Sequence, residues 1–374
     1  MIVKPKFQIK PKETVQELEK PLDSVPAVPA LKDIRKLSLQ ELQVFFVEHG
    51  EKAFRAKQVY EWLWKKSISS FEQLKNLSSE QRNLLASHFT INAVTISEQQ
   101  QSKDGTVKIG FRLFDGNLVE GVLIPTEDRM TACISSQVGC SLTCKFCATG
   151  YMDRVRNLDP AEIYDQVVLI DRIAKEKYNM PLTNIVYMGM GEPMLNYANV
   201  LKSAELITSP EGLGMAAKRL TVSTAGIAKM IKKLGDDGVR FNLALSLHAA
   251  NDEKRNQIMP INESNTLEAL RDALKYFYQK TKNKVTFEYI VFNQFNDTLK
   301  DAEELYKFCK HLPVKVNIIE YNPIAEAQFT NATEDKITKF AQYLEDRGMV
   351  VNVRRSRGKD IDAACGQLAI KERK

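Results

Sequence analysis

Three cysteines lie close together in the segment GCSLTCKFCATG, where Cys140, Cys144 and Cys147 follow a C-x3-C-x2-C spacing. Thiolates so close in the chain repel one another unless a cation holds them, so the spacing predicts a metal centre. A structural zinc site closes with four ligands, but this loop offers three, and the nearest downstream histidine is His248. Three ligands favour an iron–sulfur cluster with one iron left open. The alternatives are a zinc knuckle with a remote fourth ligand or three incidental cysteines.

Short motifs with glycine, serine or amide side chains follow several predicted strands. MGMGEP contains Gly191 and Glu192, VSTAG contains Ser223, LSLHA contains His248, and EYNPI contains Asn322. Glycines let a backbone approach a ligand closely, and carbonyl groups there can accept a hydrogen bond from an ammonium group. Taken alone, a glycine pair is more often an ordinary turn, and a single histidine is more often structural.

Three further cysteines stand outside this cluster. Cys133 precedes Cys140 by seven residues, and Cys365 lies in AACGQL, beyond the basic run at 354–357. A lone cysteine is usually inert, and Cys309 lies in an amphipathic stretch where we expect it to fill the core. For Cys133, the alternative is a buried strand residue in TACISS.

The composition is that of a large folded protein. The 374 residues are 44% hydrophobic and 27% charged, enough for a large core with an accessory module and unlike a mostly disordered chain. No run of 18 apolar residues predicts a membrane span, and the opening MIVKPKFQIKPKE lacks the apolar stretch of a secretory signal. We therefore expect a cytoplasmic protein whose cysteines are thiols, ligands or catalysts rather than structural disulfides. The net charge of +6 permits a polyanionic partner without requiring one.

The elements that must position these residues fall into four parts. Residues 1–30 contain five prolines among lysines and glutamates, which predicts a disordered tail. Residues 31–92 repeat apolar side chains at helical spacing and predict a small all-helical module. Residues 93–128 alternate apolar and polar side chains around an Asp-Gly hairpin turn, which predicts a short β linker or extension. Residues 129–374 form the largest part.

Strand-like and helix-like stretches alternate in this last part, which predicts an α/β fold. Seven strand candidates run from TACISSQ to MVVNVRRS. The clearest helix begins with Asp159 as cap, Pro160 as first residue and Glu162 completing a capping box. About six strand–helix repeats imply a parallel sheet, either open or curled into a full or partial barrel. Sites in such sheets gather at the C-terminal ends of the strands, where nearly all the motifs fall.

Aromatic and basic residues are mixed in FRAKQVYEWLWKK, within the helical module. This mixture suits contacts with RNA backbone and bases. The alternative is a helix that uses its aromatic residues as core.

The cysteine spacing, with Phe146 before the last cysteine, resembles the signature of the radical S-adenosylmethionine (SAM) superfamily. Further segments are similar, in the same order, to the family of bacterial dual-specificity rRNA and tRNA adenine-C2 methyltransferases. They are ISSQVGCSLTCKFCATG, MGMGEPMLN, LTVSTAG, LALSLHA, MPIN and DIDAACGQL. The resemblance extends from about residue 31 to residue 368. It implies a partial (β/α)6 TIM-like radical SAM barrel with a small N-terminal helical accessory domain that binds RNA through its charged face.

The resemblance also implies the cofactors and the residues that bind them. Cys140, Cys144 and Cys147 would hold one [4Fe-4S] cluster, whose open iron binds the amino and carboxylate groups of SAM. The implied SAM contacts are Gly191, Glu192, Ser223, Ser246, Leu247, His248 and Asn322. Two SAM molecules would be used per turnover, and an electron donor such as flavodoxin would supply the reduction.

Three residues match the family's catalytic positions. One SAM would methylate Cys365, and a second would give a radical that takes hydrogen from the S-methyl group, so that its carbon adds to C2 of adenine. Glu120 would accept the C2 proton. Cys133 would then attack the Cys365 sulfur and release the product as a disulfide forms. Without the resemblance, Glu120 is better interpreted as a solvated strand carboxylate.

The implied substrates are adenosine 2503 of 23S rRNA and adenosine 37 of some tRNAs, bound by a monomer without membrane contact. The target base must leave its stack. The nearest alternative is the antibiotic-resistance relative that methylates C8 of the same rRNA adenosine. That relative carries alanine where this chain has Pro193, which favours C2. A non-enzymatic zinc-binding RNA protein is the alternative from another class.

One departure from the family is Asp153-Arg154, near the expected substrate entrance, where many relatives carry a glycine and an aromatic residue.

Overall fold

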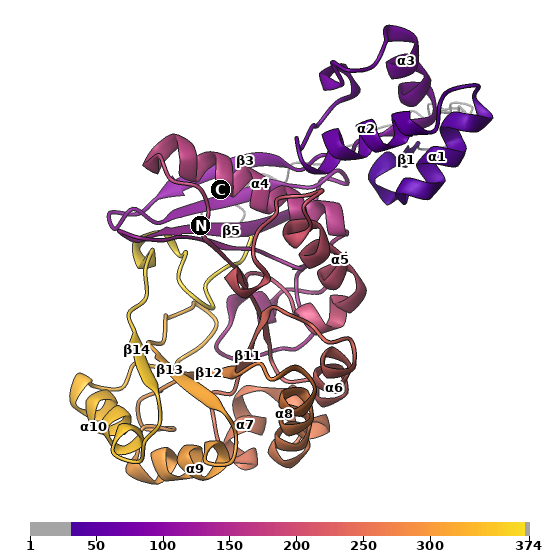
Figure 1. Ribbon diagram of the computed structural model, residues 1–374. Coiled ribbons are helices and arrows are strands. Elements are labelled where there is room, and N and C mark those ends of the chain that lie inside the picture. The colour runs from indigo at the N-terminus through magenta and orange to yellow at the C-terminus, as the bar shows by residue number, and fades with distance from the viewer. Residues whose placement is uncertain (1–30, 371–374) are drawn as a thin grey trace, which may run out of the picture.

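The computed structural model describes residues 31–370, so the tail predicted for residues 1–30 lies outside the described residues. The described part consists of a helical module, a long sheet and helices packed on that sheet (Figure 1). No helix in this part combines the length and the apolar character that crossing a membrane requires.

The N-terminal module contains three short helices, as its periodicity predicts. Ser38 and Ser78 begin two of them with capping boxes, in which serine and the third helical residue satisfy each other's free N–H groups. The elements are β1 (Lys32–Asp33), α1 (Leu39–Glu48), α2 (Phe54–Trp64), α3 (Ser79–His88) and β2 (Phe89–Thr90). The module projects from one corner of the molecule (Figure 1).

A ten-stranded sheet forms the body of the protein. From one edge to the other its strands are β14 (Val351–Arg354), β13 (Val314–Ile319), β12 (Val285–Ile290), β11 (Asn242–Ser246), β10 (Leu220–Thr224), β9 (Asn184–Tyr187), β6 (Met130–Cys133), β5 (Leu118–Pro125), β4 (Val107–Arg112) and β3 (Thr95–Gln101). The strands from β14 to β6 are parallel to one another, and β5, β4 and β3 continue the sheet in antiparallel pairing. The segment predicted as a β linker or extension is thus an extension of the same sheet.

The parallel strands and their helices form a curved, open barrel, which confirms the predicted α/β class (Figure 1). The helices are α4 (Pro160–Tyr178), α5 (Tyr197–Thr208), α6 (Ala228–Asp236), α7 (Asp252–Ile258), α8 (Leu267–Thr281), α9 (Leu299–Cys309) and α10 (Glu334–Glu345). Asp159 and Glu162 form the predicted capping box of α4. A small antiparallel pair, β7 (Gln137–Val138) with β8 (Arg156–Asn157), lies before α4.

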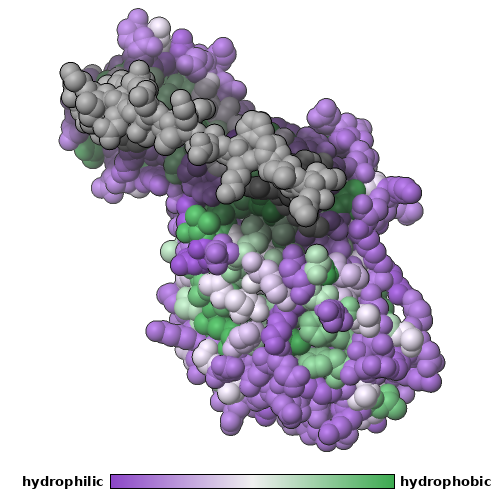
Figure 2. Space-filling view, turned by 180° about the vertical axis from the view of Figure 1, so that it is seen from behind, coloured by the Kyte–Doolittle hydropathy of each residue, from purple (hydrophilic) through white to green (hydrophobic). Residues whose placement is uncertain are grey.

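A buried arginine of the helical module attaches it to the barrel. Arg35 is 8% exposed, and its guanidinium contacts Asp33 at 3.1 Å and Asp165 of α4 at 2.9 Å. The Tyr164 hydroxyl donates to the Trp64 carbonyl. On the face drawn in Figure 2, hydrophobic side chains gather over the middle of the molecule, with hydrophilic surface around them.

The C-terminal segment, residues 355–370, joins the two edges of the sheet. It leaves edge strand β14 and reaches the turn between β4 and edge strand β3. There the Gly358 N–H donates to Asp104 at 2.9 Å, and the Ser102 hydroxyl donates to Asp360 at 2.5 Å. The segment therefore spans the open side of the barrel and carries Cys365 across it.

Candidate active site

The three clustered cysteines lie in one loop between β6 and α4, called the cysteine loop (residues 139–152) below. Cys140, Cys144 and Cys147 are each partly exposed and pack against a group of buried apolar side chains. That group is Leu142, Phe146, Ala225, Ile258, Met259, Ile290, Phe292, Ile319 and Tyr321. The thiols therefore lie at the edge of an apolar surface, which limits solvent access to a metal centre.

Burial and the neighbouring thiols disfavour loss of the thiol protons in the absence of a cation. Burial raises the pKa of Cys140 to about 11 and raises that of Cys144 well above its usual range, and the neighbouring thiolates raise both further. Arg255, itself fully buried, opposes the rise at Cys144. A metal centre supplies the positive charge that three such thiolates need.

The donor set fits an iron–sulfur cluster better than one metal ion. Within residues 31–370, no three His, Cys, Asp or Glu side chains converge closely enough to hold a single ion. A zinc site requires that convergence, with ligand atoms at about 2.0–2.3 Å from the ion. In a [4Fe-4S] cluster each thiolate binds a different iron, so the thiols need not meet at one point.

The MGMGEP turn follows β9 and packs against the start of the cysteine loop. Gly191 has a φ of +95°, and a Cβ there would lie 2.5 Å from the side chain of Gln137, so only glycine fits. Gln137 accepts a hydrogen bond from the Glu192 N–H at 2.8 Å. The buried Glu192 carboxylate accepts from the N–H groups of Met194 at 3.0 Å and Ala225 at 2.8 Å. Glu192 thereby ties the end of β9 to the end of β10.

Three predicted ligand contacts lie at the ends of β10, β11 and β13. The hydroxyl oxygens of Ser223 and Ser246 are 3.4 Å apart. Asn322 donates from Nδ2 to the Cys365 carbonyl at 3.0 Å, while its buried Oδ1 has no partner among the described residues. A buried polar atom without a partner requires an explanation, and a bound ligand is one.

Leu247 and His248 form a tight turn after β11. Leu247 is fully buried, and its N–H donates to the Glu288 carbonyl at 3.0 Å. The His248 Nδ1 accepts from the Ile290 N–H at 3.1 Å, so the neutral ring carries its proton on Nε2. Burial lowers the pKa of His248 to about 3, and Arg255 acts in the same direction. His248 is therefore a neutral N–H donor at physiological pH.

Cys365 lies beside the cysteine loop, because the C-terminal segment is bound there. The Ala148 N–H donates to the Gly366 carbonyl at 2.7 Å, and the Thr149 hydroxyl donates to the Leu368 carbonyl at 2.6 Å. The Cys365 side chain has exposed surface, yet protein atoms crowd its sulfur and raise the pKa of the thiol to about 11. Two segments far apart in the sequence thus meet at the predicted thiols.

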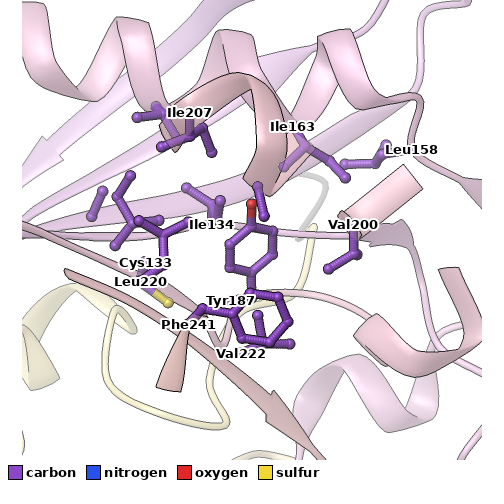
Figure 3. Close-up of a cluster of buried hydrophobic side chains, with 14 of the residues drawn as sticks. Cys133, Ile134, Leu158, Ile163, Tyr187, Val200, Ile207, Leu220, Val222 and Phe241 are labelled. Carbon is purple, nitrogen blue, oxygen red and sulfur yellow. The ribbon is translucent and has the colours of Figure 1, made fainter. Parts of the chain in front are cut away.

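Cys133 ends β6 at the edge of the main apolar core (Figure 3). It is 8% exposed; burial raises its pKa to about 12, and the charge of Cys365 acts in the same direction. Both are free thiols in the structure. Cys309 is fully buried in α9, as predicted for a core residue.

Glu120 lies on β5 and is buried rather than solvated. Its Oε1 is 3.0 Å from Nζ of Lys108 on β4, and its Oε2 accepts from the Ala369 N–H at 2.9 Å. Its own N–H contacts the sulfur of Met190 at 3.3 Å. Burial raises the pKa of Glu120, and Lys108 opposes that rise. Glu120 therefore connects the β extension, the MGMGEP turn and the C-terminal segment.

Two charged residues at this end of the barrel lie outside the motifs that the sequence analysis identified. Arg255 of α7 donates to three main-chain carbonyls at the ends of β10 and β11. Glu288 of β12 is buried, accepts from Asn317 at 2.8 Å and lies 3.6 Å from Arg354. In the sequence, nothing distinguishes Arg255 from an ordinary surface residue of a short helix, although the structure buries it completely. The only signal for Glu288 is one carboxylate inside the otherwise apolar stretch VTFEYIVF.

The aromatic residues of α2 divide between core and surface. Trp64 is buried and Phe54 is exposed, while Tyr60 and Trp62 are partly buried. Most of these rings therefore pack within the protein. Exposed basic residues in and beside the same helix are Lys57, Lys65 and Lys66.

Two family models match the chain. The model of the radical SAM superfamily covers residues 134–309, and the model of the ribosomal RNA large subunit methyltransferase N-terminal domain covers residues 32–91. The first match contains the cysteine loop, and the second contains the helical module.

Similar proteins match over most of their length. The chain is 68% identical over 341 residues to the "Probable dual-specificity RNA methyltransferase RlmN" of Cytophaga hutchinsonii, which covers 91% of this chain and 93% of that protein. It is 42% identical over 336 residues to the "Dual-specificity RNA methyltransferase RlmN" of Geobacter sulfurreducens, covering 90% and 91%. The crystal structure of a radical SAM methyltransferase from Sphaerobacter thermophilus matches with a TM-score of 0.85 and 38% identity, over 90% of this chain and 99% of that one.

Proposed function

The chain belongs to the RlmN family of dual-specificity RNA methyltransferases within the radical SAM superfamily, and from this premise we propose that it methylates C2 of adenosine 2503 in 23S rRNA and C2 of adenosine 37 in tRNAs. It is a SAM-dependent RNA methyltransferase that uses a [4Fe-4S] cluster. The observation that carries the proposal of methyl transfer through Cys365 is the docking of its segment on the cysteine loop, through the Ala148–Gly366 hydrogen bond of 2.7 Å. The choice of C2 over C8 rests on Pro193.

The cofactor site would lie at the C-terminal ends of the parallel strands. Cys140, Cys144 and Cys147 would hold the cluster, which with SAM supplies the methyl group and the radical chemistry when both are bound. The residues proposed to contact SAM are Gly191, Glu192, Ser223, Ser246, Leu247, His248 and Asn322. The partnerless Asn322 Oδ1 and the His248 Nε2–H support this assignment. Leu247 would contribute an apolar contact, because its N–H and carbonyl are bound within the protein.

A thiol is needed because C2 of adenine is an electron-poor aromatic carbon without a lone pair. Direct polar transfer of a methyl cation to that carbon is therefore unfavourable. Cys365 would carry the methyl group as a thioether, and after this group gives one hydrogen atom to the SAM-derived radical, its carbon would form a bond to C2 and link the protein to RNA. The exposed side of Cys365 supports access by a large substrate.

Glu120 and Cys133 would complete the reaction. Glu120 would accept the C2 proton as a general base. The Cys133 thiolate would attack the Cys365 sulfur, forming an S–S bond and breaking the S–C bond, whose electron pair stays on the product carbon and takes up a proton to complete the methyl group. Cys133 stands opposite Val122 of β5, two residues from Glu120, whose carboxylate accepts from the Ala369 N–H four residues after Cys365, and this placement supports the pairing.

RNA would be bound by the helical module and by the rim of the barrel. The exposed lysines in and beside α2 would contact phosphates, and the target base would flip out of its stack to reach Cys365. The exposed pair Asp153-Arg154 would lie at the entrance. We further propose a cytoplasmic monomer that takes its electron from a donor such as flavodoxin.

Mass spectrometry of modified nucleosides from cells with and without the gene tests the substrate assignment. We expect 2-methyladenosine to disappear from both 23S rRNA and tRNA when the gene is removed. Unchanged 2-methyladenosine in both RNAs would refute the proposal. Loss of 8-methyladenosine instead would identify the C8 activity. We do not expect this result, because the C8 relative carries alanine where this chain has Pro193.

A further inference from the structure

Lys108 and Glu120 form an ion pair that is almost closed off from solvent. Their side chains are 7% and 5% exposed, and Nζ lies 3.0 Å from Oε1. Lys108 stands opposite Val122 on the neighbouring antiparallel strand, two residues from Glu120, so both side chains project from the same face of the sheet. Lysine is rarely buried without a paired charge, and burying both charges is costly unless their geometry is well satisfied.

The same pair contacts the C-terminal segment on both sides of Cys365. The Lys108 ammonium lies 3.5 Å from the Asp362 carbonyl, three residues before the cysteine. The Ala369 N–H, four residues after it, donates to the second Glu120 oxygen at 2.9 Å. The carboxylate is thereby fixed relative to the segment that carries the thiol.

We propose that Lys108 is a positioning residue of the methyl transfer, whose ammonium keeps the Glu120 carboxylate ionised and oriented beside the Cys365 segment until it accepts the C2 proton. This inference rests on the proposed role of Glu120. In the step concerned, the C2–H bond breaks, its electron pair stays in the adenine adduct, and the proton forms an O–H bond with Glu120; nothing is oxidised or reduced. A carboxylate has about four lone-pair positions, so the two contacts described leave room for the proton.

The charges around Glu120 set the direction of the pH effect. Burial raises the pKa of Glu120, Lys108 of β4 opposes the rise, and Glu98 of β3 adds to it. The C-terminal segment contributes the Ala369 N–H, which favours the ionised form, and the MGMGEP turn contributes the neutral sulfur of Met190. Without the ammonium, Glu120 would stay protonated to a higher pH, and a protonated carboxyl cannot act as the base.

The test measures RNA methylation by Lys108→Gln between about pH 6 and pH 9 under single-turnover conditions, with an RNA hairpin as substrate. Glutamine removes the charge but keeps an N–H donor for Glu120 and for the Asp362 carbonyl. We expect the acidic limb of the rate profile to move up by about one pH unit or more, since an opposite charge at this distance shifts a pKa by about 1–3 units. On the acidic limb, at pH values below the pKa of the base in both proteins, a shift of one unit lowers the rate about tenfold, and the rate should recover as the pH rises.

Two further readouts separate this role from a merely structural one. At pH values below the acidic limb of its own rate profile, Lys108→Gln should accumulate a covalent protein–RNA species. This species should disappear when the pH is raised. The methyl group on Cys365 should still be installed, because that step does not use Glu120. Lys108→Arg should restore the wild-type profile, and Lys175→Met, at an exposed lysine of α4, should leave the profile unchanged.

The outcomes distinguish this inference from the proposed function. If Glu120→Gln is inactive while Lys108→Gln keeps the wild-type pH profile, the role of Lys108 is overturned and that of Glu120 stands. If Glu120→Gln turns over normally, the base is another group and both assignments fall. A uniform loss of rate at every pH, without rescue by Lys108→Arg, would also overturn the inference.

Discussion

The cysteine loop and the transfer site, defined as Cys133, Glu120 and Cys365, are assembled in different ways. The loop takes all three of its thiols from one short stretch between β6 and α4. The transfer site instead joins β5, β6 and the C-terminal segment, because β5 pairs with β6 and the Glu120 carboxylate of β5 accepts from the Ala369 N–H. Binding of the cluster should therefore be independent of the transfer residues, and mutations should separate the two.

The largest effect is expected in the cysteine loop itself. Replacing any one of Cys140, Cys144 or Cys147 by alanine should abolish both iron loading and reductive cleavage of SAM, because two thiolates do not hold the cluster in place. Iron and sulfide analysis of anaerobically purified protein, with assay of 5′-deoxyadenosine, checks this. A single variant that still cleaved SAM would remove that cysteine from the ligand set.

Cys365→Ala should leave the cysteine loop intact and abolish the function of the transfer site. We expect normal iron content and no methyl transfer to RNA, since the methyl carrier is absent. Wild-type protein from SAM-replete cells should show about 14 Da of added mass on the peptide that contains Cys365. If mass spectrometry located that methyl group on Cys309 instead, the assignment would fail.

Cys133→Ala should stop the reaction at its last step, the release of the product. The cluster, the methyl group on Cys365 and the addition to C2 should all form, but no thiolate would attack the Cys365 sulfur. A nuclease-sensitive band above the free protein should appear on denaturing gels, and it should be missing from Cys133→Ala/Cys365→Ala. Normal turnover by a folded Cys133→Ala enzyme would leave Cys133 as a strand residue only.

Asp104→Ala should give the smallest effect, because it loosens the C-terminal segment without touching a reacting group. Asp104 accepts from the Gly358 N–H at 2.9 Å, and its hydrogen bonds lower its pKa to about 2 although burial acts against this. We expect roughly a fivefold slower methylation of RNA, the equivalent of about 1 kcal/mol, with unchanged iron content. Equal losses of iron and methylation would show that the two regions are not independent.

The difference in assembly also decides what the sequence could predict. The cysteine loop could be identified as a candidate ligand set because its three thiols lie close together in the chain, and the capping box of α4 because caps are local. The role of Lys108 could not be predicted, since it depends on pairing between β4 and β5 and on the return of the C-terminal segment. Arg255 could not be predicted either, because burial of a charged helix residue is decided by the carbonyls that the tertiary fold brings to it.

The C-terminal segment that spans the open side of the barrel also has a consequence for biosynthesis. Translation delivers the cysteine loop more than 200 residues before the stretch that closes over it, as the separation of 219 residues between Thr149 and Leu368 shows. At about 5–20 residues per second, the ribosome needs at least about ten seconds for that interval. During this time the loop is made but its partner segment is not, so the C-terminal segment cannot cover the cysteine loop until synthesis is nearly complete.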